Sequence, residues 1–193
     1  MKIENVEFFK SVDISDQKVY FDEKKEIVFV GRSNVGKSSL LNTLFIKKHL
    51  AYTSATPWKT RTANIFVVNH KYYFTDLPGY GFAKMGKENR EKLDALISWY
   101  LEERKWYIKN VVMILDSKIG PQKTDLDMFQ YISELWIPLT IVLNKIDKLS
   151  NNDRVKSLKH AEELFFGQKV CLVSALWNQW VDDLRKYIFE LLK

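Results

Sequence analysis

The segment Gly31–Ser39 constrains this chain more than any other part of the sequence. It reads GRSNVGKSS, which fits the pattern G-x-x-x-x-G-K-[ST], and it lies between the apolar run Ile27–Val30 and the helix-like run Leu40–Leu44. A strand, a glycine-containing loop and a helix in this order allow successive backbone N–H groups to point at one phosphate, with the helix N-terminus behind them. The pattern therefore predicts a nucleotide-phosphate site at the carboxyl end of a strand.

Two residues of this phosphate loop have predicted chemical roles. Lys37 is expected to place its ammonium between the β- and γ-phosphates, and the Ser38 hydroxyl is expected to bind Mg²⁺. An ordinary glycine turn is the alternative interpretation, and the flanking strand and helix argue against it. The predicted nucleotide contacts in the loop are Gly31, Arg32, Ser33, Asn34, Val35, Gly36, Lys37, Ser38 and Ser39.

A second motif predicts which base is bound. The β-rich run Ile141–Leu143 leads directly into Asn144-Lys145-Ile146-Asp147. An aspartate at this strand end can accept hydrogen bonds from the N1–H and the exocyclic amine of guanine, and adenine has no such donor pair. Sites built to pair a substrate N–H reject analogues that lack it by about 10⁴–10⁵. The Lys145 stem is expected to lie along the base and Asn144 to tie neighbouring loops together. Alone the motif also fits a polar loop, but after a phosphate loop it indicates guanine.

A third motif lies between the other two. The strand-like run Tyr72–Thr75 ends in Asp76-Leu77-Pro78-Gly79. Asp76 is expected to hold Mg²⁺ through water. The Gly79 N–H is expected to contact a γ-phosphate, and glycine leaves the following loop free to change when that phosphate departs. A plain Pro-Gly turn is the alternative.

Two further contacts are predicted from the order of segments along the chain. The polar segment Ile46–Thr62 is expected to close over Mg²⁺ and the γ-phosphate, and Thr60 is favoured among its hydroxyls by spacing and neighbours. The apolar run Val170–Val173 leads into Ser174-Ala175, whose backbone groups are expected to contact the guanine oxygen. The candidate catalytic residues are Lys37, Thr60 and Gly79, the candidate metal ligands are Ser38, Thr60 and Asp76, and the nucleotide contacts outside the phosphate loop are Asp76, Gly79, Asn144, Lys145, Asp147, Ser174 and Ala175.

Apolar strand-like runs alternate with helix-like runs through the rest of the chain. This alternation predicts an α/β fold with a mostly parallel six-stranded sheet, helices on both faces and one antiparallel edge strand. Ligands in such sheets bind at the carboxyl ends of strands, where all the motifs lie. The predicted strands are Lys25–Val30, Ala63–Val68, Lys71–Thr75, Val111–Asp116, Leu139–Asn144 and Val170–Ser174, and the predicted helices are Lys37–Phe45, Glu88–Glu103, Thr124–Glu134, Asn152–Phe165 and Trp180–Leu191.

The length of 193 residues predicts one domain, residues 1–193, with a short N-terminal extension over residues 1–24. No apolar run approaches the roughly eighteen residues of a membrane span, and no export signal is recognised at the N-terminus. We therefore expect a cytoplasmic protein without membrane contact. The single cysteine, Cys171, lies in a predicted strand and is expected to pack as a small hydrophobe.

The longer motif Asp76–Lys84, together with Asp116–Pro121 and Asp125, resembles the EngB family of the translation-factor-related small GTPases. The similarity runs from about Glu7 to the C-terminus. It implies a Ras-like P-loop GTPase fold, GTP and GDP as ligands, Mg²⁺ as cofactor and a role in assembly of the large ribosomal subunit, with rRNA and ribosomal proteins as partners. This chain departs from the family at Pro57-Trp58-Lys59-Thr60, where relatives have Pro-Gly-x-Thr. We expect a monomer.

The residue after Gly79 bears on the rate of hydrolysis. Ras-like enzymes have a glutamine there that orients the attacking water, and this chain has Tyr80. A phenol substitutes poorly, so slow intrinsic hydrolysis is expected. Two additions are expected to raise the rate of hydrolysis. One is a partner that completes the site, which raises the rate by about 10³–10⁵ when it supplies a catalytic cation. The other is a K⁺ ion near the phosphates, beside Asn34.

The charge balance bears on the partner. The net charge is +6, and Lys84, Lys87, Arg90 and Lys92 follow the third motif closely. This cluster is expected to contact RNA phosphates, and a solvated helix face is the alternative. Two rival functions stay open: a P-loop kinase or ATPase, which would not need the guanine motif, and a non-hydrolysing GTP-dependent RNA- or ribosome-binding assembly module.

Overall fold

The computed structural model describes residues 3–16, 22–47, 50–51, 62–81 and 86–193. Strands and helices alternate along the chain as the sequence predicts. In chain order the elements are β1 (Val6–Val12), η1 (Ile14–Asp16), β2 (Glu26–Gly31), α1 (Lys37–Leu44), β3 (Ala63–Val68), β4 (Tyr72–Asp76), α2 (Lys87–Arg104), β5 (Ile108–Asp116), α3 (Lys123–Glu134), β6 (Leu139–Asn144), η2 (Ile146–Lys148), α4 (Asn151–Leu164), β7 (Lys169–Leu172) and α5 (Val181–Leu191).

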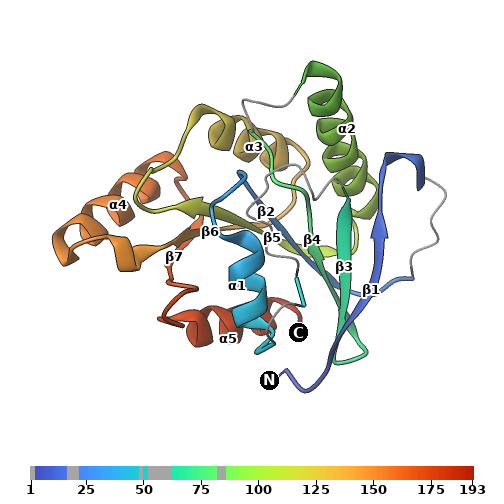
Figure 1. Cartoon of the computed structure of the whole chain (residues 1–193), viewed down its shortest axis with the longest axis horizontal. Helices are drawn as coiled ribbons and strands as arrows, with labels where there is room; N and C mark the ends of the chain where they lie inside the picture. Colours follow the sequence, from blue (N-terminus) through green and yellow to red (C-terminus); the bar gives the residue numbers. More distant parts are fainter. Residues whose placement is uncertain (1–2, 17–21, 48–49, 52–61, 82–85) are drawn as a thin grey trace.

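All the strands of the described residues belong to one sheet, in the order β1-β3-β4-β2-β5-β6-β7. The pairs β2–β4, β2–β5, β5–β6 and β6–β7 are parallel, whereas β3 is antiparallel to β4 and to β1. The mostly parallel sheet and its antiparallel hairpin are thereby confirmed. Because β2, β5 and β6 end at the same edge, this topology brings the phosphate loop and the guanine motif together (Figure 1).

The predicted count of six strands is wrong, since the described residues form a sheet of seven strands. The additional strand, β1, lies within residues 1–24 and pairs with β3 at the sheet edge. Only Val6 and Val12 of β1 are buried, and an irregularity between Phe8 and Lys10 shifts its register. An edge strand with one weakly apolar face and a bulge lacks the regular alternation by which strands are found in a sequence.

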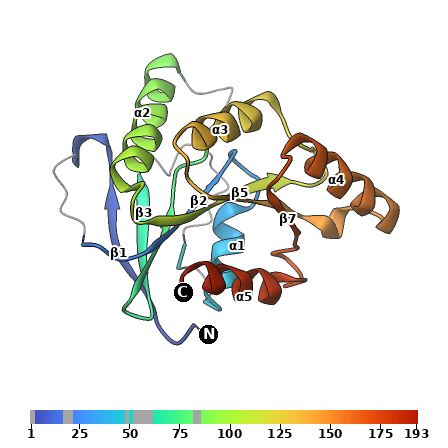
Figure 2. The same ribbon diagram turned by 180° about the vertical axis from the view of Figure 1, so that it is seen from behind.

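Helices cover both faces of the sheet, as Figures 1 and 2 show from opposite sides. Helices α1 and α5 pack on one face, where Leu41 and Ile188 belong to the same apolar cluster. Helices α2, α3 and α4 pack on the other face, where Ile97, Ile132 and Ala161 share a second cluster. No helix within the described ranges is long and apolar enough to cross a membrane.

A buried polar cluster lies at the start of β2, the end of the strand away from the phosphate loop. The Glu26 carboxylate is fully buried and accepts a hydrogen bond from Arg104 Nε at 2.9 Å. Its other oxygen accepts hydrogen bonds from the hydroxyls of Thr75 and Tyr100, both at 2.5 Å. Arg104, at the end of α2, is also buried and donates to the Asp22 carbonyl oxygen at 3.0 Å. This cluster fixes α2 against the sheet.

Candidate functional site

The phosphate loop curls as the motif predicts. Asn34 and Gly36 have positive φ angles of 71° and 91°. Alternation of left- and right-handed residues turns successive N–H groups to one side, which makes a concave anion site. A Cβ atom on Gly36 would lie 2.6 Å from Asn144 Nδ2, so close approach as well as backbone conformation requires glycine here. Helix α1 begins at Lys37, within the motif Gly31–Ser39, so the helix N-terminus follows Gly36 directly.

Three side chains meet at the mouth of the phosphate loop. Lys37 forms a buried ion pair with Asp76, and Ser38 Oγ donates to the other Asp76 oxygen at 3.3 Å. A hydroxyl and a carboxylate held this close match the oxygen ligands that Mg²⁺ prefers, and Mg²⁺ usually keeps several waters besides. The predicted metal ligands Ser38 and Asp76 therefore fit the ion.

The third motif is joined to the phosphate loop by its backbone. The Ser33 N–H donates to the Tyr80 carbonyl oxygen at 3.1 Å, and Ser33 Oγ donates to the Gly79 carbonyl oxygen at 3.2 Å. A Cβ atom on Gly79 would lie 3.0 Å from the Ser33 backbone, so the two segments touch. The predicted γ-phosphate contact thus lies beside the phosphate loop.

Asn144 connects three segments of the site. Its side-chain amide donates to the Val35 carbonyl oxygen at 3.0 Å and to the Gly36 carbonyl oxygen at 3.5 Å, and its amide oxygen accepts the Ala175 N–H at 3.1 Å. The side chain is buried. It therefore ties the loops together as the sequence predicts.

The other two residues of the guanine motif are also held in place. Lys145, with a left-handed φ of 66°, donates from Nζ to the Asn34 carbonyl oxygen at 2.5 Å and pairs with Asp116 at 2.7 Å. Asp147 accepts a hydrogen bond from the Ser174 hydroxyl. The Lys145 stem thus runs from the guanine motif to the phosphate loop, and Asp147 lies beside Ser174.

Asp116 is a site residue to which the sequence assigns no role. Burial would raise the pKa of its carboxyl, but the hydrogen bond and charge of Lys145, with the N–H groups of Lys118 and Ile119, lower that pKa below its usual value. The carboxylate is therefore charged and fixes the direction of the Lys145 side chain. Its position in the motif Asp116–Pro121, at the end of β5, is the sequence signal that points to it.

Asp125 is the second site residue to which the sequence assigns no role. Fully buried at the start of α3, it accepts hydrogen bonds from Arg32 Nε at 2.8 Å, from the Tyr80 hydroxyl at 2.9 Å and from the Gln122 N–H at 2.9 Å. The Arg32 side chain is thus directed to α3, away from the loop it belongs to. Burial, with the charge and hydrogen bond of Asp125, raises the pKa of the Tyr80 hydroxyl well above its usual value. Tyr80 is therefore a protonated donor that joins the third motif to α3.

This arrangement predicts the effect of removing one hydroxyl. Tyr80→Phe takes a donor from the buried Asp125 carboxylate, and the unfolding free energy should fall by about 1–3 kcal/mol, as measured by urea denaturation. Tyr131→Phe is the matched control, because the Tyr131 hydroxyl bonds the exposed Glu102. An equal loss in both variants would contradict the role given to Asp125.

Two predicted contacts lie outside the described residues. Thr60, the predicted Mg²⁺-closing residue, is one, and Lys84, from the basic cluster, is the other. The described cations of that cluster are Lys87, Arg90 and Lys92, all on α2.

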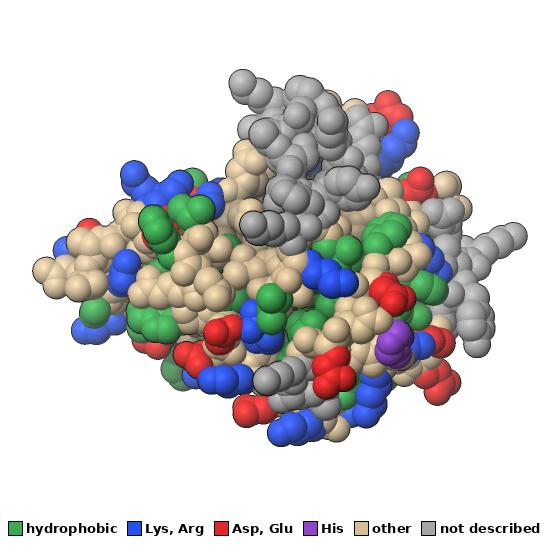
Figure 3. Space-filling model, turned by 60° about the horizontal axis from the view of Figure 1, so that its bottom comes forward, with side chains coloured by type: hydrophobic (Ala, Val, Ile, Leu, Met, Phe, Trp, Pro, Cys, Tyr) green, Lys and Arg blue, Asp and Glu red, His purple; other side chains and the backbone are tan. Residues whose placement is uncertain are grey.

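The cations on α2 are partly balanced by carboxylates on the same helix. Lys92 pairs with Glu88 at 2.7 Å, and Lys87 lies 3.9 Å from Glu91. Such exposed pairs contribute only about 0–1 kcal/mol, so a phosphate can replace either carboxylate. The net charge of the chain is +6. On the face shown in Figure 3, the basic and acidic side chains of the described residues are interspersed and form no large basic patch.

Comparison with known proteins places this site in a family. A family described as "50S ribosome-binding GTPase" matches residues 26–145. The "Probable GTP-binding protein EngB" of Thermotoga maritima is 44% identical over 173 residues, covering 88% of each chain. That of Natranaerobius thermophilus is 40% identical over 195 residues, covering all of both chains. A solved structure, "Crystal structure of a probable GTP-binding protein engB", aligns with a TM-score of 0.74 and 28% identity, covering 86% of this chain and 98% of that one.

Proposed function

The chain belongs to the EngB family of GTP-binding proteins, and from this premise we propose that it is a guanine-nucleotide switch that hydrolyses GTP slowly and assists assembly of the large ribosomal subunit. The observation that carries the proposal is the joining of the guanine motif to the phosphate loop by Asn144 and Lys145. A single ligand that has a guanine base and phosphates can then contact both parts.

Slow hydrolysis is proposed from the position of Tyr80. Its hydroxyl donates to Asp125, and its side chain is buried, so it is not free to orient a water at the γ-phosphate. In this proposal Lys37 and the phosphate-loop N–H groups neutralise phosphate charge, and Gly79 contacts the γ-phosphate. Ser38, Asp76 and Thr60 would hold Mg²⁺, which supplies charge neutralisation when bound. A ribosomal partner or a K⁺ ion near Asn34 would raise the rate.

The ribosomal part of the proposal is supported by the family description, which names binding to the 50S particle. The alternative is a module that binds GTP and the particle without turnover. Release of inorganic phosphate, measured with and without purified large subunits, separates the two. Turnover that rises with added subunits supports the switch, and its absence under both conditions supports the module.

Nucleotide selectivity is the direct test of the guanine site. We expect unlabelled GDP and GTP to displace fluorescent GDP from the purified protein, and ATP to compete at least about 10³-fold more weakly, because adenine lacks the donor pair that Asp147 would accept. Fluorescence titration measures all three. Equal competition by ATP would remove the guanine assignment and leave a P-loop kinase or ATPase as the better interpretation.

A further inference from the structure

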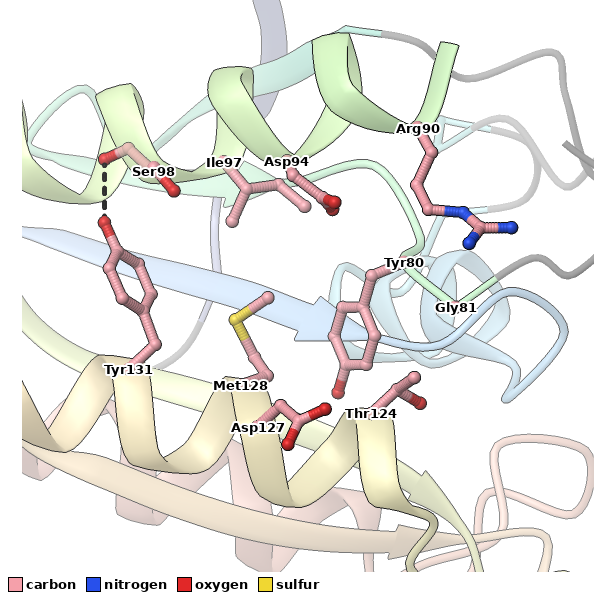
Figure 4. Close-up of a pocket in the computed structure, with 10 residues that line it drawn as sticks. All are labelled: Tyr80, Gly81, Arg90, Asp94, Ile97, Ser98, Thr124, Asp127, Met128 and Tyr131. Carbon is pink, nitrogen blue, oxygen red and sulfur yellow. Dashed lines mark hydrogen bonds between the residues drawn. The ribbon is translucent and has the colours of Figure 1, made fainter. Parts of the chain in front are cut away.

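A second pocket lies between α2 and α3, behind Tyr80. Its volume is about 470 Å³, and it is lined by Tyr80, Gly81, Arg90, Asp94, Ile97, Ser98, Thr124, Asp127, Met128 and Tyr131 (Figure 4). None of the predicted nucleotide contacts lines it. The pocket is therefore distinct from the phosphate and guanine site. The two are neighbours, because Tyr80 lines the pocket and directly follows Gly79, a predicted nucleotide contact.

The lining combines an apolar interior with two carboxylates. Ile97 from α2 and Met128 from α3 face each other across the space, and Asp94 and Asp127 stand on opposite walls (Figure 4). Neither carboxylate forms a direct ion pair with any residue that the structure describes. The pocket thus presents negative charge at two sides of an apolar channel.

Arg90 does not neutralise this charge in full. Burial raises the pKa of the Asp94 carboxyl, and the Arg90 charge lowers it by less than burial raises it. In Figure 4 the Arg90 guanidinium lies on the side of Gly81, away from the space between the two aspartates. Asp94 and Asp127 are both exposed residues, so their carboxylates can be reached by a cation from solvent and can hydrogen-bond to it.

We propose that this pocket is a docking site for an arginine or lysine side chain of a partner protein, with the charged group between Asp94 and Asp127 and the methylene stem against Ile97 and Met128. Long basic side chains have this combination of apolar stem and charged head. RNA phosphates would meet two like charges here and are disfavoured. The inference deepens the proposed function, on which it rests for the identity of the partner, since it assigns this surface to a ribosomal protein and not to rRNA.

Tyr80 connects the docking site to the phosphate loop of the nucleotide site. Tyr80 lines the pocket, and its carbonyl oxygen accepts the Ser33 N–H of the phosphate loop. Its hydroxyl bonds Asp125 at the start of α3, the helix that supplies the opposite wall. We therefore expect a change in the backbone at Gly79 to alter the pocket wall through Tyr80.

The chemistry of the pocket can be tested with a small probe on the intact GDP-loaded protein. Butylguanidinium should shift the ¹³C-labelled methyl of Met128 saturably, with a Kd of about 1–10 mM for so small a ligand. The core residue Met113 is the internal reference. The neutral isostere butylurea should bind at least about tenfold more weakly, since it lacks the charge that the carboxylates attract. Equal binding of both probes would overturn the proposal.

Matched variants test whether the carboxylates and the partner assignment are right. The double variant Asp94→Asn/Asp127→Asn should weaken butylguanidinium binding, and binding of purified large subunits in sedimentation, each at least about tenfold. Glu162→Gln, an exposed change on α4, should alter neither. The proposal is overturned if the double variant binds butylguanidinium or the large subunits as strongly as the unchanged protein does. It is also overturned if an RNA oligonucleotide, added without butylguanidinium, shifts the Met128 methyl signal. GDP affinity is measured in parallel, so a failure of the guanine site is seen separately from a failure of the pocket.

Discussion

Asp147→Ala is expected to lower the affinity for GDP and GTP by at least about 10³-fold, because sites built to pair a substrate N–H discriminate by about 10⁴–10⁵ against analogues that lack it. The Asp147 carboxylate is fixed by the Ser174 hydroxyl, and Ser174 is fully buried. A carboxylate held in this way is ready to accept the two guanine donors without reorganisation. Titration with fluorescent GDP measures the loss.

The matched variant Asp147→Asn distinguishes base recognition from general damage. An asparagine still accepts the Ser174 hydrogen bond, but it presents one donor and one acceptor where the aspartate presents two acceptors. Xanthine has a carbonyl where guanine has its amine, so xanthosine diphosphate should bind this variant better than GDP does. Retention of GDP affinity by both variants would remove Asp147 from the site.

Arg104→Met is expected to reduce the free energy of unfolding by about 3–5 kcal/mol, a large fraction of the roughly 5–15 kcal/mol of a typical domain. The variant leaves Glu26 charged, fully buried and deprived of its cation. It also removes the guanidinium from the Asp22 carbonyl oxygen and from the Tyr107 ring, whose centroid lies 4.6 Å away. Urea denaturation with a nucleotide-free sample gives the change.

Two companion variants identify the cause of that loss. Lys105→Met alters the exposed neighbouring cation and should cost less than about 0.5 kcal/mol. Adding Glu26→Gln to Arg104→Met removes the uncompensated charge and should recover part of the stability. A loss below about 1 kcal/mol in Arg104→Met, or no recovery in the double variant, would show that the buried ion pair does not anchor α2.

The sequence predicts those parts of the molecule that depend on local pattern. The strand, loop and helix around Gly31–Ser39 and the guanine motif at the end of β6 have fixed spacings, and all but one of the strands come from apolar runs. It does not predict β1, whose stability depends on pairing with β3 more than fifty residues later. Contacts between distant residues, such as Arg104 with Glu26, leave no trace in spacing.

The same limit applies within the site. Asp116 and Asp125 belong to recognisable motifs, but nothing in the sequence says that one holds Lys145 and the other Arg32. Tyr80 is predicted as a poor replacement for a water-orienting glutamine, and its bond to Asp125 depends on where α3 begins. Such partners follow from the packing of elements that are far apart in the chain.

The central place of β2 in the sheet determines the order in which the parts of the nucleotide site can form during synthesis. Both neighbours of β2, β4 and β5, are translated after it, so the phosphate loop emerges before the strands that support it. The Asn144 side chain, which holds the phosphate loop, is added later still, and its hydrogen bonds join Gly36 to Ala175. Non-local pairing of this kind is slow and is completed late. The contacts of Asn144 with Gly36 and Ala175 can therefore form only after residue 175 has been synthesised.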